Sequence, residues 1–425
     1  MTTRPGAPVS RAGQASRLDP ARRAHAKVPS LRVLWVPYAQ RGSLYPVAPV
    51  IQELRARGAD VAALGPPRLS GLVNAVGARL LDSAIDFDWS SPDRCDRHQL
   101  GPAAGGEWLT DRVAAEYAET SEACQAFGPD VLLIDSFVIG ASLFAESAGA
   151  ARASYVHYLF DQGAHVDAMH RVWWESFGPE PDGYFRWWNL LRQAVGLGPE
   201  IRPAADAPWY RMSPQRTFLL GHPHLRRGDR VLPPYVTRTS LPPWDEPGGA
   251  AGGLLPPSRQ RPVVLLANSS AWQDDIELVR ATLDGLADEK VTVVVTISAE
   301  HPCDFDVPAN AAVRGYTPHT WLLPFTDIVV STAGYGLVTK ALWHGVPLVL
   351  APRGRDQSYV AEAAARLGCG TQLPWPPEPA AVRAAVAAAL AGMNHPARQV
   401  AGPVAGYPGA AEVTEAIAEL AGARP

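Results

Sequence analysis

Short apolar runs alternate with amphipathic stretches over the first half of the chain. Leu31–Pro37 is typical of a buried parallel strand, and Asp60–Leu64 and Asp130–Ile134 are further runs of this kind. Between the first two runs, apolar residues recur with the i, i+3, i+4, i+7 spacing of one helix face, at Val47, Val50, Ile51 and Leu54. This alternation of strand and helix predicts an α/β fold with a parallel sheet.

The pattern weakens between about 165 and 240, where Pro, Trp and Arg are frequent, and the Gly-rich run Pro247–Gly253 is typical of a flexible linker. Alternation then resumes, with apolar strands expected at 262–267, 291–296, 327–330 and 347–350. The sequence predicts five parts, which are a disordered tail at 1–29, an α/β domain at 30–242, a Gly/Pro-rich linker at 243–261, a second α/β domain at 262–405 and a C-terminal helix at 406–425. Whether this last helix packs back on the first domain is left open.

Composition and charge exclude several classes of partner. The 425 residues are 47% hydrophobic, which allows a large core, and a formal net charge of −4 without a long Lys/Arg run argues against nucleic acid. No apolar run approaches the ~20 residues of a membrane helix, and residues 1–29 lack the apolar segment of a secretory signal. The four cysteines are scattered without a zinc motif, which fits a reducing cytoplasm.

The stretch Phe325–Gln357 is the most informative for chemistry. It is predicted to form a strand, a glycine turn, a helix, a second strand and a loop that ends in Asp356-Gln357. The turn Thr332–Gly336 stands where a buried strand meets a helix N-terminus, and the free N–H groups and helix dipole there favour a diphosphate. Asp356 and Gln357 can hydrogen-bond a polyol. A diphosphate site followed by a polyol site indicates a nucleotide sugar.

Three further motifs carry a family resemblance: Tyr316-Thr-Pro-His319, Leu322–Asp327 and Asn268-Ser-Ser270. With the turn and loop above, they make the chain from about Leu31 to Leu420 resemble the bacterial GT-B glycosyltransferases that transfer sugars from UDP- or dTDP-sugars to antibiotics and other natural products. The resemblance implies two Rossmann-like domains facing across a cleft, the first for the acceptor and the second for the nucleotide sugar. It implies a nucleotide-sugar co-substrate without a cofactor or metal, in a monomer or homodimer.

The resemblance also assigns the donor residues one by one. Tyr316 would lie against the nucleotide base with His319 nearby, and Asp356 and Gln357 would bind sugar hydroxyls. The residues expected to hold the diphosphate are Ser269, Ser270 and the turn Thr332, Ala333, Gly334, Tyr335 and Gly336.

Two departures from the family bear on catalysis. The usual His-Gly-Gly turn is Thr332-Ala333-Gly334 here, and the catalytic His of the family falls on Ser43 in the loop Gln40–Pro46. A neutral hydroxyl is a poor general base. Asp135 at the end of a buried strand is the leading remaining candidate, with Ser43 or water as a relay, although capping of the next helix explains it equally well. His157 can also reach the cleft, but a lone His near a strand end is more often structural.

Aromatic residues provide candidates for the acceptor site. Trp108, Trp173 and Trp174 are assigned to an apolar pocket, because aromatic side chains give large contact areas. The runs Asp86-Phe-Asp88 and Asp304-Phe-Asp306 imitate the metal motif of a different glycosyltransferase fold. They lie at no matching place in this architecture and are interpreted as surface loops.

The sequence therefore favours an inverting glycosyltransferase that acts on a hydrophobic small molecule. The alternative is a catalytically silent homologue that binds ligand or assists a partner glycosyltransferase. Loss of the usual His at position 43 favours this alternative, whereas retention of Asp356-Gln357 argues against it. A GT-B epimerase is a third possibility, which the long Trp-rich segment disfavours because epimerisation needs no large acceptor pocket.

Overall fold

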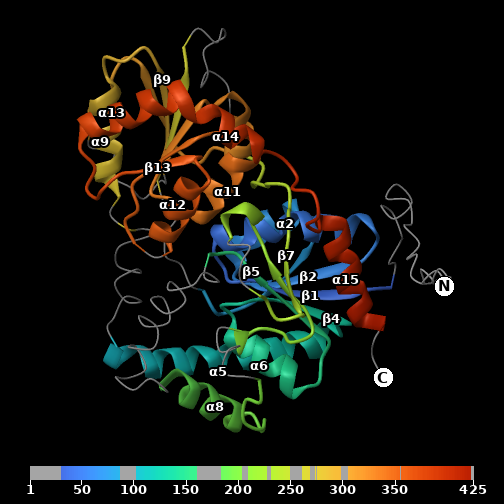
Figure 1. Cartoon of the computed structure of the whole chain (residues 1–425). Helices are drawn as coiled ribbons and strands as arrows, with labels where there is room; N and C mark the ends of the chain where they lie inside the picture. Colours follow the sequence, from blue (N-terminus) through green and yellow to red (C-terminus); the bar gives the residue numbers. More distant parts are fainter. Residues whose placement is uncertain are drawn as a thin grey trace, which may run out of the picture.

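The structure is a computed structural model that describes residues 30–86, 102–159, 183–202, 209–226, 231–248, 261–268, 273, 275–297, 305–354 and 356–422. Figure 1 shows two α/β domains one above the other, with the N-terminal domain in blue and green below and the C-terminal domain in orange and red above.

The N-terminal sheet has seven parallel strands in the order β3-β2-β1-β4-β5-β6-β7. Its central strands are almost wholly buried and apolar, as expected of a parallel sheet covered on both faces. The strands are β1 (Arg32–Val36), β2 (Asp60–Gly65), β3 (Arg79–Asp82), β4 (Val131–Asp135), β5 (Arg152–Val156), β6 (Thr217–Leu219) and β7 (Val236–Arg238).

Helices cover both faces of this sheet. One face packs against α2, and the other packs against α5 and α6. Helices α5 and α6 approach so closely at Gly140 that a Cβ there would lie 2.2 Å from Val113 O. The helical segments are α2 (Arg41–Ala56), η1 (Pro67–Leu69), α3 (Ser70–Ala75), α5 (Pro102–Phe127), α6 (Ile139–Ser147), α8 (Gly183–Ala194) and η3 (Pro223–Leu225).

The C-terminal sheet has six parallel strands in the order β10-β9-β8-β11-β12-β13. Its strands are β8 (Val263–Ala267), β9 (Thr292–Thr296), β10 (Ala311–Arg314), β11 (Ile328–Ser331), β12 (Leu348–Leu350) and β13 (Gly370–Gln372). The helical segments are α9 (Ile276–Leu286), α10 (His319–Leu322), η4 (Leu323–Phe325), α11 (Tyr335–Trp343), α12 (Gln357–Arg366), α13 (Pro379–Ala388), η5 (Ala389–Met393) and α14 (Asn394–Gln399).

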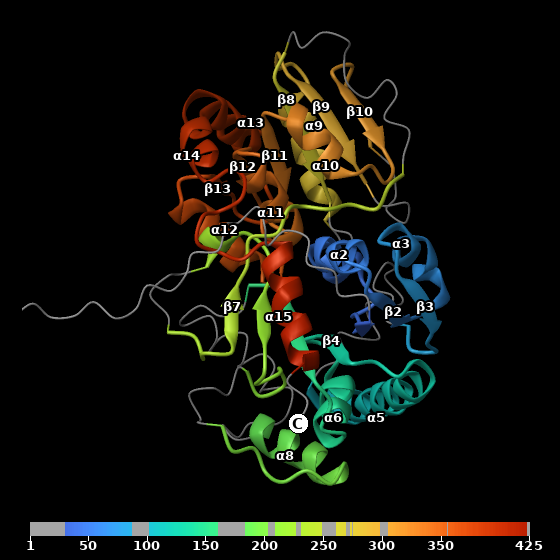
Figure 2. The same cartoon turned by 90° about the vertical axis from the view of Figure 1, so that its right-hand side faces the viewer.

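The last helix, α15 (Ala410–Gly422), crosses back to the N-terminal domain, as Figure 2 shows in red. Val413 and Ile417 of α15 belong to the hydrophobic core that contains Leu44 and Ile51 of α2. The chain therefore crosses between the domains twice, once through the linker and once before α15.

The strands expected from apolar runs are present, with ends that differ by about one residue. The segment from 165 to 240, in which the pattern weakens, carries α8, β6 and β7 in its described parts. Strands β6 and β7 have three residues each, and a run of that length shows no readable alternation.

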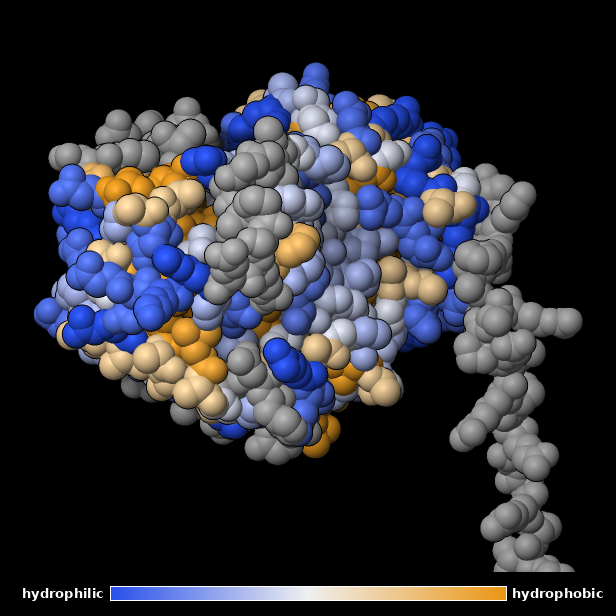
Figure 3. Space-filling view, turned by 90° about the horizontal axis from the view of Figure 1, so that it is seen from above, coloured by the Kyte–Doolittle hydropathy of each residue, from blue (hydrophilic) through white to orange (hydrophobic). Residues whose placement is uncertain are grey.

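Polar and apolar side chains intermingle on the surface seen from above in Figure 3. Within the described ranges, no helix has both the length and the apolar character that crossing a membrane requires.

Candidate functional site

In each sheet there is one pair of neighbouring strands at which the direction of strand addition reverses. The candidate residues lie at these two positions. The pair is β1 and β4 in the first sheet and β8 and β11 in the second. The carboxyl ends of such neighbouring strands leave a crevice that binds ligands in open α/β sheets. Ser43 follows β1, Asp135 ends β4, and Thr332–Gly336 follows β11. The topology therefore puts both predicted sites at the ligand-binding edges.

Asp135 is the centre of a cluster in the N-terminal domain. Its Oδ1 accepts a hydrogen bond from Phe137 N at 2.8 Å, and its Oδ2 accepts one from Ser43 Oγ. The same Oδ2 lies 3.1 Å from His157 Nδ1. Ser43 and Asp135 are 0% exposed, whereas the His157 side chain is 11% exposed. The three predicted catalytic residues thus come together, and of these three only His157 has surface that a ligand can touch.

Tyr155 borders the same cluster. It pairs in register with Asp135 between β5 and β4, and its hydroxyl accepts a hydrogen bond from Trp35 Nε1 at 3.1 Å. Burial, followed by the Asp135 carboxylate, raises the pKa of Tyr155 well above its usual value. The phenol therefore keeps its proton at neutral pH, and the carboxylate is next to a neutral hydroxyl.

An ion pair on α5 supports the loop that follows Asp135. Arg112 Nε donates to Glu116 Oε1 at 2.7 Å, and Arg112 Nη2 donates to Phe137 O at 2.6 Å. Glu116 Oε2 accepts a hydrogen bond from Gly140 N at 2.9 Å. Burial raises the pKa of Glu116, and the Arg112 cation opposes this rise. The pair thus fixes the backbone whose N–H binds Asp135.

A pocket opens beside this cluster at the carboxyl ends of β1 and β2. Its empty volume, including the open mouth, is about 380 Å³. Only about 30 Å³ of this space can hold the centre of a water molecule, so the pocket is small beside the ~300–1,000 Å³ of typical ligand sites. Tyr38 in its wall lies 5.5 Å from the ring of Phe137, which in turn lies 5.4 Å from His157. The pocket is lined by Val36, Pro37, Tyr38, Ala39, Leu64, Gly65, Pro66, Ser83, Ile85, Glu116, Glu119, Thr120 and Val138.

The turn Thr332–Gly336 leads from β11 into α11. Ala333 has φ +65° and is the non-glycine residue with positive φ in the described part of the chain. This conformation costs about 1–2 kcal/mol for a residue with a Cβ, and such strain concentrates at functional sites. Among the described residues, no atom lies within 4 Å of a Cβ built at Gly334 or Gly336. The described part of the chain therefore leaves space beside the N-terminus of α11, as a diphosphate site requires.

The carboxamide of Gln357 is bonded within the protein. Its Oε1 accepts hydrogen bonds from Arg353 N at 2.8 Å and Gly354 N at 3.0 Å. Its Nε2 donates to Gln273 Oε1 at 2.9 Å, and Gln273 Nε2 donates to Thr332 Oγ1 at 3.1 Å. This chain of amides links the predicted sugar-binding loop to the diphosphate turn.

Asp356 and Tyr335 reach across to the N-terminal domain. Asp356 Oδ2 accepts a hydrogen bond from Leu159 N at 3.1 Å, two residues after His157. Tyr335 Oη donates to Leu220 O at 2.9 Å. The carboxylate of Asp356, which is predicted to bind the sugar, therefore lies next to the segment that carries His157, and the side chain of Tyr335 packs between the two domains.

Tyr316 lies where the second domain meets α2. Its hydroxyl accepts a hydrogen bond from Tyr45 Oη at 3.1 Å and donates to Glu246 O at 2.9 Å. The Arg41 guanidinium lies 5.1 Å from its ring centroid. Burial raises the pKa of Tyr316 to about 12. The residue is 38% exposed, which leaves ring surface for a stacking base.

His319 is the first residue of α10, and its Nε2 lies 2.9 Å from Thr296 Oγ1. Burial, followed by the Lys340 ammonium, lowers the pKa of His319 to about 4. The ring is therefore neutral at pH 7. Lys340 is paired with Asp245 of the linker, and Asp245 also accepts a hydrogen bond from Thr320 N at 2.8 Å. This buried pair attaches the linker to the second domain.

Several predicted residues lie outside the described part of the chain, namely Ser269, Ser270, Trp173 and Trp174. Trp108 lies in α5, where its backbone is described but its side chain is not. Asp86 accepts hydrogen bonds from Arg68 at 2.5 and 2.8 Å. Among the described residues, no three His, Cys, Asp or Glu side chains meet in an arrangement that could hold a metal ion.

Sequence reasoning missed Tyr155, Gln273 and the pair Lys340–Asp245. Tyr155 could have been found, because it stands two residues before His157 and alternate residues of a strand share a face. Gln273 follows the predicted phosphate loop closely enough to be considered with it. The ion pair joins residues 95 apart in the chain, and no local pattern announces such a contact.

The sequence is similar to proteins of antibiotic biosynthesis. Residues 280–420 match the family model of the erythromycin biosynthesis protein CIII-like C-terminal domain. The 4'-demethylrebeccamycin synthase of Lentzea aerocolonigenes is 27% identical over 376 residues, which are 80% of this chain and 87% of that protein. The tylactone mycaminosyltransferase of Streptomyces fradiae is 23% identical, over 85% and 86% of the two chains. The UDP-glucosyltransferase avaP of Aspergillus versicolor is 33% identical, but over 31% of this chain and 28% of its own length.

Solved structures show the same architecture. The calicheamicin glycosyltransferase CalG4 superposes with a TM-score of 0.72 at 20% identity, over 92% of this chain and 98% of that chain. The glycosyltransferase VinC, solved in complex with dTDP, gives a TM-score of 0.70 at 19% identity, over 92% and 100% of the two chains. The predicted fold is thereby confirmed. The chain is a homologue of the natural-product glycosyltransferases and has their GT-B fold, two Rossmann-like domains that face each other across a cleft.

Proposed function

We propose that the chain is an inverting glycosyltransferase that moves a hexose or deoxyhexose from a UDP- or dTDP-sugar to a hydrophobic small molecule of secondary metabolism. The observation that carries the proposal is the hydrogen bond between Asp356 and Leu159. This bond brings the carboxylate of Asp356, in the predicted sugar-binding loop, next to the segment that carries His157. His157 in turn contacts Asp135. The names of the rebeccamycin and tylactone relatives, and the dTDP bound in the VinC structure, support these substrate classes.

In this proposal the two domains divide the reaction. The turn Thr332–Gly336 holds the diphosphate, Tyr316 stacks on the base, and Asp356 and Gln357 contact the sugar. The acceptor occupies the pocket beside Tyr38. Its nucleophilic atom attacks C1 from the face opposite the diphosphate, and the C1–O bond breaks with its electron pair passing to the diphosphate. N–H donors fixed in a dry cleft stabilise that departing charge best.

Nucleoside diphosphates test the donor assignment. UDP or dTDP at millimolar concentration should raise the melting temperature, because a ligand of the native state stabilises by about 2.7 kcal/mol at a hundred times its Kd. A chelator should leave this shift unchanged, since the diphosphate turn needs no metal. A melting curve that neither nucleotide moves would contradict the donor site.

A catalytically silent homologue is the second candidate. The observation that favours it is the full burial of both Ser43 and Asp135, which keeps these two groups from an acceptor. Such a protein would bind UDP or dTDP without forming glycoside. Mass spectrometry of a mixture with UDP-glucose or dTDP-glucose and a panel of phenolic acceptors separates the candidates, because the enzyme yields product masses increased by one hexose.

A further inference from the structure

The position that carries the usual base holds Ser43, yet the Asp135 carboxylate still has an imidazole beside it. That imidazole comes from His157, just after β5, whereas Ser43, which was expected in a loop, lies in the first turn of α2. Its Nδ1 lies 3.1 Å from Asp135 Oδ2, and it makes no other polar contact with described residues. The contact falls short of a well-aligned hydrogen bond, as is common for catalytic pairs before substrate binds.

Exposure distinguishes the groups that could take a proton from an acceptor. A general base must come within hydrogen-bond distance of the proton it removes. Ser43 and Asp135 are 0% exposed, and the hydroxyl proton of Ser43 is already donated to Asp135. The His157 side chain is 11% exposed. Of these three groups, His157 is therefore the one that can touch an acceptor.

The orientation of the ring suits this role. A carboxylate beside Nδ1 favours the tautomer that carries its proton on Nδ1, which leaves the Nε2 lone pair free to accept a proton. Nε2 lies on the opposite side of the ring and points away from Asp135. The Asp135 charge would also stabilise the imidazolium that forms.

His157 lies beside the donor loop, and one aromatic ring, that of Phe137, separates it from Tyr38 in the wall of the pocket. Phe137 and Tyr158 pack edge-on against the ring at 5.4 Å each, and Phe137 continues to Tyr38 in the pocket wall. On the other side, Leu159 N binds Asp356 of the sugar loop at 3.1 Å.

Several elements packed around His157 carry charged side chains. Arg211 donates to Tyr158 Oη and lies 5.5 Å from the Phe137 ring centroid. Arg226 donates to Tyr158 O at 3.0 Å, and the Arg112–Glu116 pair supports the Phe137 carbonyl.

We propose that His157, oriented by Asp135, is the general base of the glycosyl transfer; this rests on the proposed function. Nε2 removes the proton of the acceptor hydroxyl, the oxygen forms its bond to C1 of the sugar, and the C1–O bond to the diphosphate breaks with its electron pair passing to the diphosphate. In this proposal the imidazole stands just after β5 instead of in the first turn of α2, and it uses the same carboxylate.

The test compares His157→Gln with wild type on UDP-glucose or dTDP-glucose and two acceptors, phenol and 4-nitrophenol. Loss of a general base lowers turnover by about 10²–10⁴-fold. We expect a loss in that range for phenol and a clearly smaller loss for the more acidic 4-nitrophenol, which needs less help in losing its proton. His157→Ala should regain activity with added imidazole, an effect that a purely structural residue would not show. Equal losses on both acceptors without rescue would overturn the proposal.

Control variants separate this proposal from the proposed function. His224→Gln, a partly buried histidine on η3, should leave both rates unchanged, and Ser43→Ala should cost far less than His157→Gln. Calorimetric titration with UDP and dTDP should give wild-type affinity for His157→Gln. Absence of nucleotide binding in wild type would refute the donor site itself.

The Nδ1 resonance of His157 in nitrogen NMR tests the pair without turnover. It should shift in Asp135→Asn while that of His224 does not. Unchanged His157 resonances would refute the dyad even if the protein forms no glycoside.

Discussion

At the scale of single residues, Gln357 has a structural role in addition to the sugar-binding role proposed for it. The buried amide bonds two backbone N–H groups of its own loop and the side chain of Gln273. A sequence motif indicates that such a residue contacts sugar hydroxyls, but the motif does not show that the same amide also holds the loop in place. The proposed contact with the sugar and the order of the loop therefore depend on the same amide.

We predict that Gln357→Ala weakens binding of UDP-glucose or dTDP-glucose more than binding of UDP or dTDP, by about ten- to hundredfold. Each unpaired group costs about 1–3 kcal/mol, and 1.4 kcal/mol is tenfold in affinity. Calorimetric titration of the four ligands measures the difference. Gln273→Ala is the matched control, because it removes the partner of Nε2 but leaves the two bonds to Oε1. Equal losses for the sugar nucleotide and the bare nucleotide would show that Gln357 acts on the loop alone.

The sequence predicted which candidate residues come together better than it predicted their contacts. Ser43 and Asp135 are candidates through the family resemblance, and His157 through its place at a strand end. The sequence did not show which of the three side chains can contact an acceptor, because that depends on which of them remains exposed. Burial of that kind results from packing between segments that lie far apart in the chain, and a motif does not encode it.

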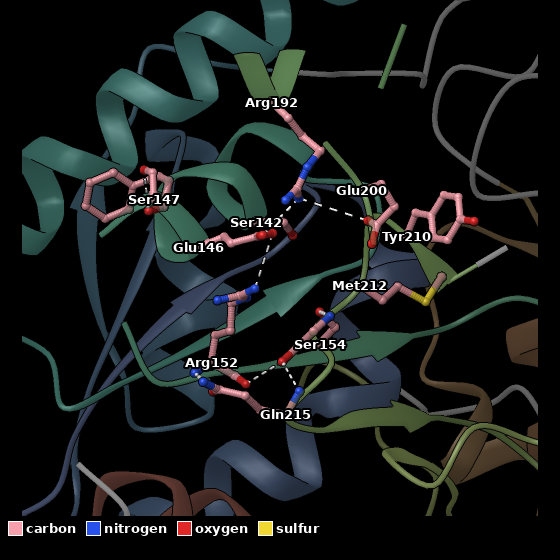
Figure 4. Close-up of polar contacts among 12 residues, drawn as sticks. Ser142, Glu146, Ser147, Arg152, Ser154, Arg192, Glu200, Tyr210, Met212 and Gln215 are labelled. Carbon is pink, nitrogen blue, oxygen red and sulfur yellow. Dashed lines mark hydrogen bonds and ion pairs between the residues drawn. The ribbon is translucent and has the colours of Figure 1, made fainter. Parts of the chain in front are cut away.

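At the scale of elements, an ion network attaches α8 to the rest of the N-terminal domain (Figure 4). Glu146 of α6 lies between Arg192 of α8, at 2.9 Å, and Arg152 of β5, at 3.4 Å. Glu200 accepts hydrogen bonds from Arg202 Nη2 at 2.8 Å and Trp188 Nε1 at 3.1 Å. Within the described ranges α8 packs against α5, α6 and Tyr210, and these charges add to that packing.

We predict that Glu200→Gln lowers the stability of the protein by about 1.5–3 kcal/mol at pH 7, the usual worth of hydrogen bonds to a charged group. Burial by itself would raise the pKa of Glu200, but the bonds from Arg202 lower it to about 2. A carboxylate with a depressed pKa stabilises fully above the unfolded value of 4.5 and loses this effect as pH falls towards 2. Melting curves should show the gap between variant and wild type closing over that range.

The control for this prediction is Glu277→Gln, which removes an exposed carboxylate paired with Arg280. Exposed pairs are worth little, so this change should stay within about 0.5 kcal/mol of wild type. A gap between Glu200→Gln and wild type that persists unchanged at pH 3 would contradict the assignment.

Elements were predictable where the hydrophobic pattern is long and regular. Helix α2 follows its apolar periodicity although Pro46 and Pro49 lie inside it, because burial of Val47, Val50, Ile51 and their neighbours outweighs the lost helix bonds. The strands that escaped prediction have three or four residues and are not apolar throughout, namely β3, β6, β7, β10 and β13. Strand β12 is equally short, but it was predictable because all three of its residues are apolar.

At the scale of the whole molecule, the two domains share packing as well as a cleft. Leu159 and Leu225 of the first domain belong to the hydrophobic core of the second, together with Tyr335 and Val338. Arg366 also donates to Leu225 O at 3.1 Å. Movements of the diphosphate turn are therefore linked to the first domain through Tyr335, the first residue of α11.

Gly221 is the position where this linkage is tightest. It has φ +105°, and a Cβ there would lie 2.3 Å from Tyr335 Oη and 2.6 Å from a ring carbon. We predict that Gly221→Ala displaces Tyr335, disturbs the turn that begins α11 and weakens binding of UDP or dTDP by about tenfold or more, equivalent to 1.4 kcal/mol. Gly149→Ala is the matched control, because φ is +61° there but no atom lies within 4 Å of the added Cβ. It should reduce stability through backbone strain alone and leave nucleotide affinity unchanged.

A double mutant tests whether the two residues are coupled. In a Tyr335→Ala background the clash is absent, so Gly221→Ala should reduce nucleotide affinity less than it does in wild type, and the difference measures the coupling of the two residues. An identical cost in both backgrounds would show that the domains do not communicate through this contact.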